Sequence, residues 1–187
     1  MTERSDLANL RALGEPRIHD WAGASEPIGA GLVEWTRLAI SHDQQLAVRA
    51  SLGACTLVIG DYPDSGPGVG TTRAPRTYIY HMLSVIQRWL DAPTRENREV
   101  VRSSLDVTRE LHAWQADDAA PFWILEAVDH TCLTVWAGER ASYIIPVDFA
   151  TTAGRVVACV FHAMRSAGRD EQRAADAVID VVLKVTA

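Results

Sequence analysis

Residues 76–91 read RTYIYHMLSVIQRWLD, and their spacing predicts a helix with one apolar and one polar face. The apolar side chains recur at intervals of three and four residues. They share one face: Tyr78, Ile79, Met82, Leu83, Val85, Ile86, Trp89 and Leu90. The other face carries Arg76, Tyr80, His81, Ser84, Gln87, Arg88 and Asp91. Such a helix buries one side against other helices, so this stretch favours a helical fold.

The helical period continues along most of the chain, whereas the alternating pattern of a β-strand is missing. Because most connections are short, consecutive helices are predicted to be antiparallel neighbours. The predicted fold class is therefore all-α, a bundle of about seven helices arranged as antiparallel helical hairpins. The predicted helices cover 5–13, 26–40, 42–59, 76–91, 95–115, 120–137, 147–167 and 169–185.

The composition divides the chain into a polar N-terminal segment, 1–24, and a single helical domain, 25–187. Within that domain, residues 60–75 are rich in glycine and proline, which predicts a long loop. Residues 42–59 are apolar nearly all round, which is typical of a helix in the middle of a bundle.

Two serines are predicted to cap helices. Ser25 precedes Glu26 and Pro27, a pattern typical of a helix start. Ser41 has capping-box spacing to Gln44. In both predictions the serine hydroxyl oxygen accepts a hydrogen bond from a backbone amide in the first turn of the helix.

The charge and the cysteines limit the possible functions. The 187 residues carry a formal net charge of −6, which argues against nucleic acid and an anionic membrane as partners. No stretch reaches the length of a membrane span. Cys55, Cys132 and Cys159 lie far apart in apolar segments, so they are interpreted as core residues of a reducing compartment, and the predicted location is cytoplasmic.

Residues 122–136, FWILEAVDHTCLTVW, contain the most site-like pattern in the chain. Glu126, Asp129 and His130 are three or four residues apart, so their side chains are neighbours on a helix. This spacing suits metal ligands or an acid–base carboxylate, although one helix cannot close a coordination sphere. The alternative, which we favour, is that Asp129 bonds a neighbouring helix and that Glu126 and His130 form an ion pair.

The chain lacks the sequence motifs of nucleophilic, phosphate-binding and metalloprotease sites. We therefore predict no catalytic residues and no cofactor. Trp123, together with Glu126 and His130, is the predicted partner-binding patch, because an exposed tryptophan beside an acidic surface suits a protein interface. The alternative, which we favour for Trp123, is packing in the core or in a groove. A cavity lined by Trp89, Trp114 and Trp136 would instead bind a small molecule.

Residues 61–90 combine a Tyr-Pro-Asp turn, a Pro75-Arg76 pair, a helix and the sequence Arg88-Trp89-Leu90. This order resembles a family of bacterial all-helical immunity proteins. The likeness covers the middle third of the chain and extends more loosely to about residue 164. It implies a small cytoplasmic helical protein that acts by binding, with no catalytic residues to carry over.

These observations lead to one principal prediction, a non-enzymatic helical interaction protein that binds and neutralises a partner such as a toxin domain. The first alternative is a metal-dependent or acid–base helical-bundle enzyme that uses Glu126, Asp129 and His130. The second is a small-molecule-binding helical bundle.

Overall fold

The computed structural model describes residues 4–14, 26–41, 43–62, 75–112, 119–136 and 148–187, and in 75 and 104–112 it describes the backbone only. Within these ranges the chain forms eight α-helices, one 3-10 turn at Ile59–Asp61 and no strand, which confirms the all-α class. The helices are α1 (Leu7–Gly14), α2 (Pro27–Ile40), α3 (Gln44–Thr56), α4 (Pro75–Asp91), α5 (Arg95–His112), α6 (Ala120–Trp136), α7 (Phe149–Ser166) and α8 (Glu171–Thr186).

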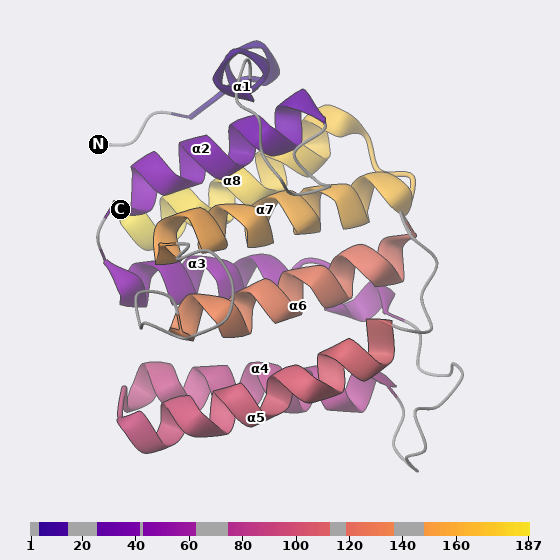
Figure 1. Cartoon of the computed structure of the whole chain (residues 1–187). Coiled ribbons are helices and arrows are strands. Elements are labelled where there is room, and N and C mark those ends of the chain that lie inside the picture. Colours follow the sequence, from indigo (N-terminus) through magenta and orange to yellow (C-terminus); the bar gives the residue numbers. More distant parts are fainter. Residues whose placement is uncertain (1–3, 15–25, 42, 63–74, 113–118, 137–147) are drawn as a thin grey trace.

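Helix α7 lies at the centre of the bundle, between α2 on one side and α6 with α3 on the other (Figure 1). Helix α8 covers α7 and α3, and the α4–α5 hairpin packs below α6. Most of α7 is buried, and its buried residues are mainly alanine and valine. Small side chains let the axes of neighbouring helices come close together, which is why several helices can surround α7.

Consecutive helices pack against each other in most of the hairpins, including α4–α5, α6–α7 and α7–α8. The prediction is wrong for α2 and α3, which do not pack along each other although only 41–43 connect them. Instead, both pack against α7. The length of the connection alone could not indicate this arrangement, because α7, which separates α2 from α3, comes about a hundred residues later in the chain.

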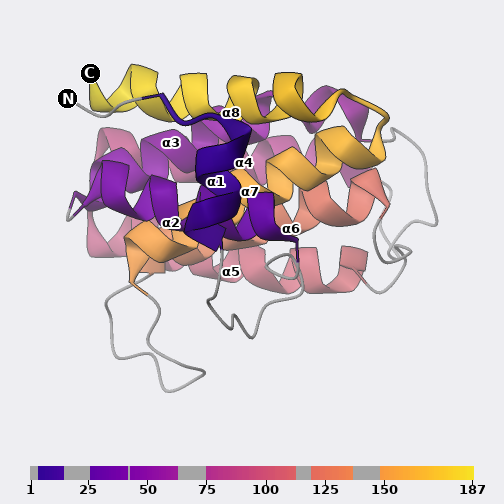
Figure 2. The same cartoon turned by 90° about the horizontal axis from the view of Figure 1, so that it is seen from above.

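Two glycines set the spacing of the helices around α2. A Cβ added at Gly154 of α7 would lie 2.5 Å from the carbonyl oxygen of Val33, and one added at Gly31 would lie 1.8 Å from that of Leu10. Gly154 is therefore a point of close contact between α7 and α2. Helix α1 runs across α2 at Gly31 (Figure 2), so residues 7–14 of the N-terminal segment belong to the bundle.

Helices α2 and α3 begin at acidic capping residues instead of the two predicted serines. The Glu26 carboxylate accepts hydrogen bonds from the amides of Ile28 and Gly29, and the Asp43 carboxylate accepts one from Leu46. Ser41 instead ends α2, with a φ of 58°. Both serine predictions are therefore wrong, because a carboxylate nearer the first turn supplies a stronger acceptor for the free amides.

The ends of the predicted 60–75 loop are held together by one side chain. The Arg76 guanidinium donates two hydrogen bonds to the backbone carbonyl of Tyr62. Tyr62 and Trp89 are both buried. Tyr62, Arg76 and Trp89, three residues of the pattern in 61–90, therefore support the architecture around α4. The rest of the loop, 63–74, lies outside the described residues.

The apolar face predicted for 76–91 is confirmed, because seven of its eight members are buried and Tyr78 is half-buried. By contrast, two apolar side chains elsewhere, Val100 of α5 and Leu133 of α6, are exposed. Among the described residues, no helix is both long and apolar enough to cross a membrane.

Candidate functional site

The contact between α6 and α7 brings together three side chains that can bind metal. Glu126 and His130 lie one turn apart on α6, with 3.4 Å between Oε2 of Glu126 and Nε2 of His130. Cys159 comes from α7, and the ligand atoms of all three residues lie within 4.8 Å of one another. In the described part of the chain, this is where His, Cys and acidic side chains gather in metal-binding geometry.

The cluster is largely shielded from water. Cys159 is fully buried, His130 is 7% exposed, and the Glu126 side chain keeps 24% of its surface accessible. Burial raises the pKa of the Cys159 thiol well above its ordinary value, and the negative charge of Glu126 raises that pKa further. The positive charge of Arg155 acts in the opposite direction. The thiol is therefore protonated at neutral pH unless a cation joins it.

The structure rearranges the predicted metal set. It keeps Glu126 and His130 together, as their spacing predicted, and adds Cys159 from a different helix. Asp129 is half-buried and is not one of the clustered ligands, although its charge also raises the pKa of the Cys159 thiol. Sequence reasoning missed Cys159 because it was interpreted only as a small core residue.

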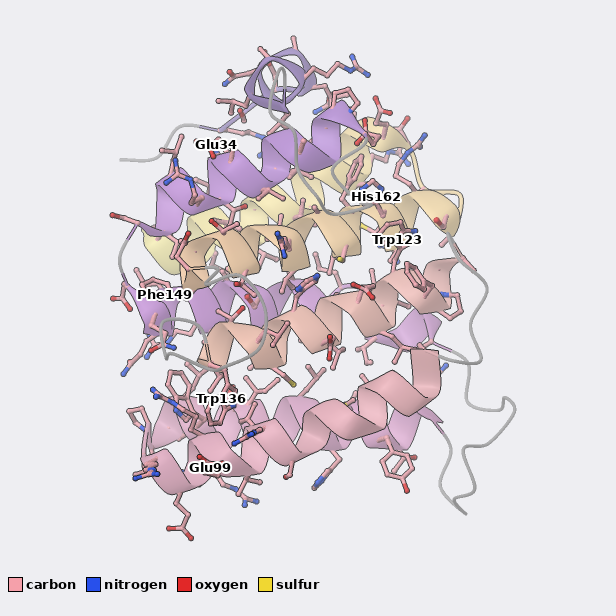
Figure 3. The ribbon with its side chains drawn as sticks, in the orientation of Figure 1. Glu34, Glu99, Trp123, Trp136, Phe149 and His162 are labelled. Atoms are coloured by element: carbon pink, nitrogen blue, oxygen red, sulfur yellow. The ribbon has the colours of Figure 1, made fainter. Side chains whose placement is uncertain are left out.

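The predicted partner-binding patch is not an exposed surface. Trp123 is 5% exposed and His130 is also buried, so these two side chains offer little surface to a partner. Its indole ring stacks on the His162 imidazole of α7, with 4.6 Å between the ring centroids (Figure 3). The wheel of α6 could not indicate this, because α7 covers the face that a lone helix would leave to solvent.

A second candidate site lies where the end of α2 meets the start of α7. Arg37, Leu38, Ser41, Asp148 and Phe149 line a shallow groove of about 430 Å³, together with Ala150. Leu38 is 58% exposed in this groove. Ser41 adopts a backbone conformation with positive φ, which residues other than glycine seldom adopt. No pattern in the sequence indicated this groove.

The groove is lined by charged side chains of both signs. Glu34 holds Arg37 through two hydrogen bonds of 2.7 and 3.0 Å, and these raise the pKa of the guanidinium. The Asp148 carboxylate also acts on Arg37. Burial by itself would raise the pKa of Asp148. The hydrogen bonds that Thr151 donates outweigh this effect, so the pKa of Asp148 is lowered. The charged side chains that line the groove are Arg37 and Asp148, and Glu34 holds Arg37 from outside the lining.

The tryptophans proposed to line a ligand cavity pack against arginines instead. Trp89 is buried, and the Arg98 guanidinium lies 6.0 Å from its ring centroid. Arg102 lies 5.5 Å from the ring centroid of Trp136. Trp114, the third predicted member, lies outside the described residues. Arginine side chains of α5 therefore cover both described rings. A cation–π contact of this kind contributes about 0.5–1 kcal/mol at an exposed site.

Comparison of the chain with known protein families, curated proteins and solved structures finds no match.

Proposed function

We propose that the chain is a non-enzymatic interaction protein of a bacterial cytoplasm, which binds and neutralises a protein partner such as a toxin domain. The proposal keeps the function implied by the likeness in 61–90 but moves the binding surface. The observation that carries it is the groove at the end of α2, where exposed Leu38 stands beside Ser41 and the carboxylate of Asp148. Strained backbone such as that of Ser41 concentrates at functional sites.

The groove suits a partner that presents an apolar side chain next to a lysine or arginine. Covering Leu38 would contribute about 1.5–3 kcal/mol, the value of burying a leucine side chain. The Asp148 carboxylate lines the groove beside Leu38 and could pair with that basic neighbour. The net charge of −6 would steer a basic protein toward the molecule and repel nucleic acid.

A test begins by identifying the partner through position 38. A photo-reactive residue is placed there and, as a control, at Leu133, which is also an exposed leucine but lies on α6. Candidate partners are proteins encoded next to this one and proteins cross-linked in its source cells. Any partner captured at position 38 is then produced separately and its Kd is measured by calorimetry.

The expected result is that Leu38→Asp weakens the purified complex at least about tenfold, or 1.4 kcal/mol, because the variant places a charge in the covered surface. Leu133→Asp should leave the Kd unchanged. Circular dichroism checks that both variants keep their helices. A partner whose Kd is insensitive to Leu38→Asp, or equal capture at both positions, contradicts the proposal.

The second candidate function is the metal-dependent or acid–base enzyme, and the cluster of Glu126, His130 and Cys159 is the observation that favours it. An enzyme also requires a cleft in which substrate reaches the reacting groups. The cluster is largely buried, and the groove at Leu38 is lined by other residues. Turnover that is lost in Glu126→Gln but retained in Leu38→Asp would favour the enzyme over the interaction protein.

A further inference from the structure

We infer that Glu126, His130 and Cys159 form a binding site for one divalent ion of the zinc class, held between α6 and α7. The ligand atoms would be a carboxylate oxygen of Glu126, an imidazole nitrogen of His130 and the sulfur of Cys159. This site is separate from the proposed docking groove, and neither proposal depends on the other.

The separations of the ligand atoms fit such an ion with a small adjustment. Tetrahedral zinc has bonds of about 2.0–2.3 Å, which place its ligand atoms about 3.3–3.8 Å apart. The distance between Glu126 Oε2 and His130 Nε2, 3.4 Å, already lies in this range. No pair in the cluster exceeds 4.8 Å, so the thiol needs to move by no more than about 1 Å to complete the set.

The chemistry of the ligands selects the ion. Imidazole and thiolate prefer zinc and similar ions, whereas magnesium and calcium are bound by sets of oxygen atoms. Three protein ligands leave a fourth tetrahedral position, which water can occupy because Glu126 retains access to solvent. We therefore expect zinc, cobalt and cadmium to bind, and magnesium and calcium not to bind.

The balance of charge also favours a divalent cation. Binding releases the thiol proton of Cys159 to solvent and forms a sulfur–metal bond. The two charges of the ion then neutralise the Glu126 carboxylate and the Cys159 thiolate, so a buried site carries no net charge. Arg155 disfavours a cation nearby, but its charge is opposed by that of Asp129, which also acts on Cys159.

The competing interpretation is a purely structural one, in which Glu126 and His130 form an ion pair and Cys159 fills space in the core. In that interpretation the Cys159 sulfur forms no bond to a metal ion. The two interpretations are therefore separated by whether the Cys159 sulfur bonds to added metal.

The experiment uses the full-length purified protein after chelator treatment and gel filtration. Cobalt(II) is added in steps while absorbance is recorded. We expect saturation at one equivalent, visible bands of tetrahedral cobalt and a near-ultraviolet thiolate-to-cobalt charge-transfer band. Zinc should then displace the cobalt and abolish these bands, whereas a large excess of magnesium should not.

The decisive variant is Cys159→Ala, which should lose the charge-transfer band. It should also bind cobalt at least about 100-fold more weakly, a larger loss than removal of a hydrogen-bond partner outside the ligand set would cause. The matched control is Cys132→Ala, which removes a fully buried thiol of α6 that lies outside the cluster. It should bind cobalt as the unchanged protein does. Because a core cysteine variant could fold poorly, Glu126→Gln, which conserves side-chain size, provides a second loss of ligand.

Thermal unfolding gives an independent reading. Saturating zinc should raise the Tm of the unchanged protein and of Cys132→Ala, because an ion that binds only the folded state stabilises it. It should not raise the Tm of Glu126→Gln. The inference is overturned if cobalt does not bind, if it binds without a charge-transfer band, or if Cys159→Ala binds it equally well.

Discussion

The α4–α5 hairpin and the α2–α7 contact are held together in opposite ways. In the hairpin, large side chains fill the space between helices, and Trp89 of α4 is buried with an α5 arginine against its ring. Between α2 and α7 the contact depends on a missing side chain, because Gly154 lets the Val33 backbone approach. The hairpin has one face in water, whereas α7 is enclosed by other helices.

This difference explains where sequence patterns are informative. A helix with one face in water needs a polar side there, so its pattern reveals which residues are buried. An enclosed helix has no such requirement, and its pattern reveals burial but not the partner of each face. The candidate sites lie beside α7, in the region where the pattern is least informative.

The largest expected effect concerns the hairpin. Trp89→Ala should lower the free energy of unfolding by about 3–5 kcal/mol, because it removes a fully buried aromatic side chain. Urea unfolding followed by circular dichroism measures this change. The control is Tyr80→Ala on the same helix, where a half-exposed ring should cost less than about 0.5 kcal/mol. Equal costs for the two variants would show that Trp89 does not anchor the hairpin.

The α2–α7 contact gives the next effect. Gly154→Ala should destabilise the fold by about 1–3 kcal/mol, because the new Cβ meets backbone atoms that cannot rotate away. Gly53→Ala is the matched control within a helix, since its Cβ meets only the end of the Val181 side chain. That methyl group must shift, but it can do so more easily than backbone, and alanine has the higher helix propensity, so this control should cost less than Gly154→Ala. A stabilising Gly154→Ala would disprove the close contact.

The smallest effect compares the caps of α5 and α7. Thr151 donates hydrogen bonds of 2.8 Å to Asp148, while the Thr94 hydroxyl accepts one from the Asn97 amide. At pH 7, Asp148→Ala and Thr94→Ala should each cost about 1 kcal/mol. The lowered pKa of Asp148 means that its ionised form stabilises the fold.

The two caps should therefore respond differently to acid. The contribution of Asp148 is complete above the unfolded-state value of about 3.9 and is lost as pH falls through its lower folded-state pKa. Urea titrations at pH 7 and at successively lower pH should show the cost of Asp148→Ala shrinking while that of Thr94→Ala stays constant. A cost of Asp148→Ala that is independent of pH would mean that its charge does not contribute.

Part of the candidate metal site was predictable. Glu126 and His130 are four residues apart, and helical geometry alone makes them neighbours. Cys159 comes from a different helix, α7, and lies far from His130 along the chain, so no local pattern connects them. The environment of Trp123 could not be read from a local pattern either, because the ring that stacks on it, His162, also comes from α7.

The sequence by itself determined the helical class, most helix positions and the inward face of α4, because backbone hydrogen bonds and apolar periodicity are local properties. Only the tertiary structure decided that α7 separates α2 from α3, that Gly154 is a contact point and that Cys159 joins Glu126 and His130. Those outcomes depend on how side chains distant in sequence fit together, and close packing is a property of the assembled helices.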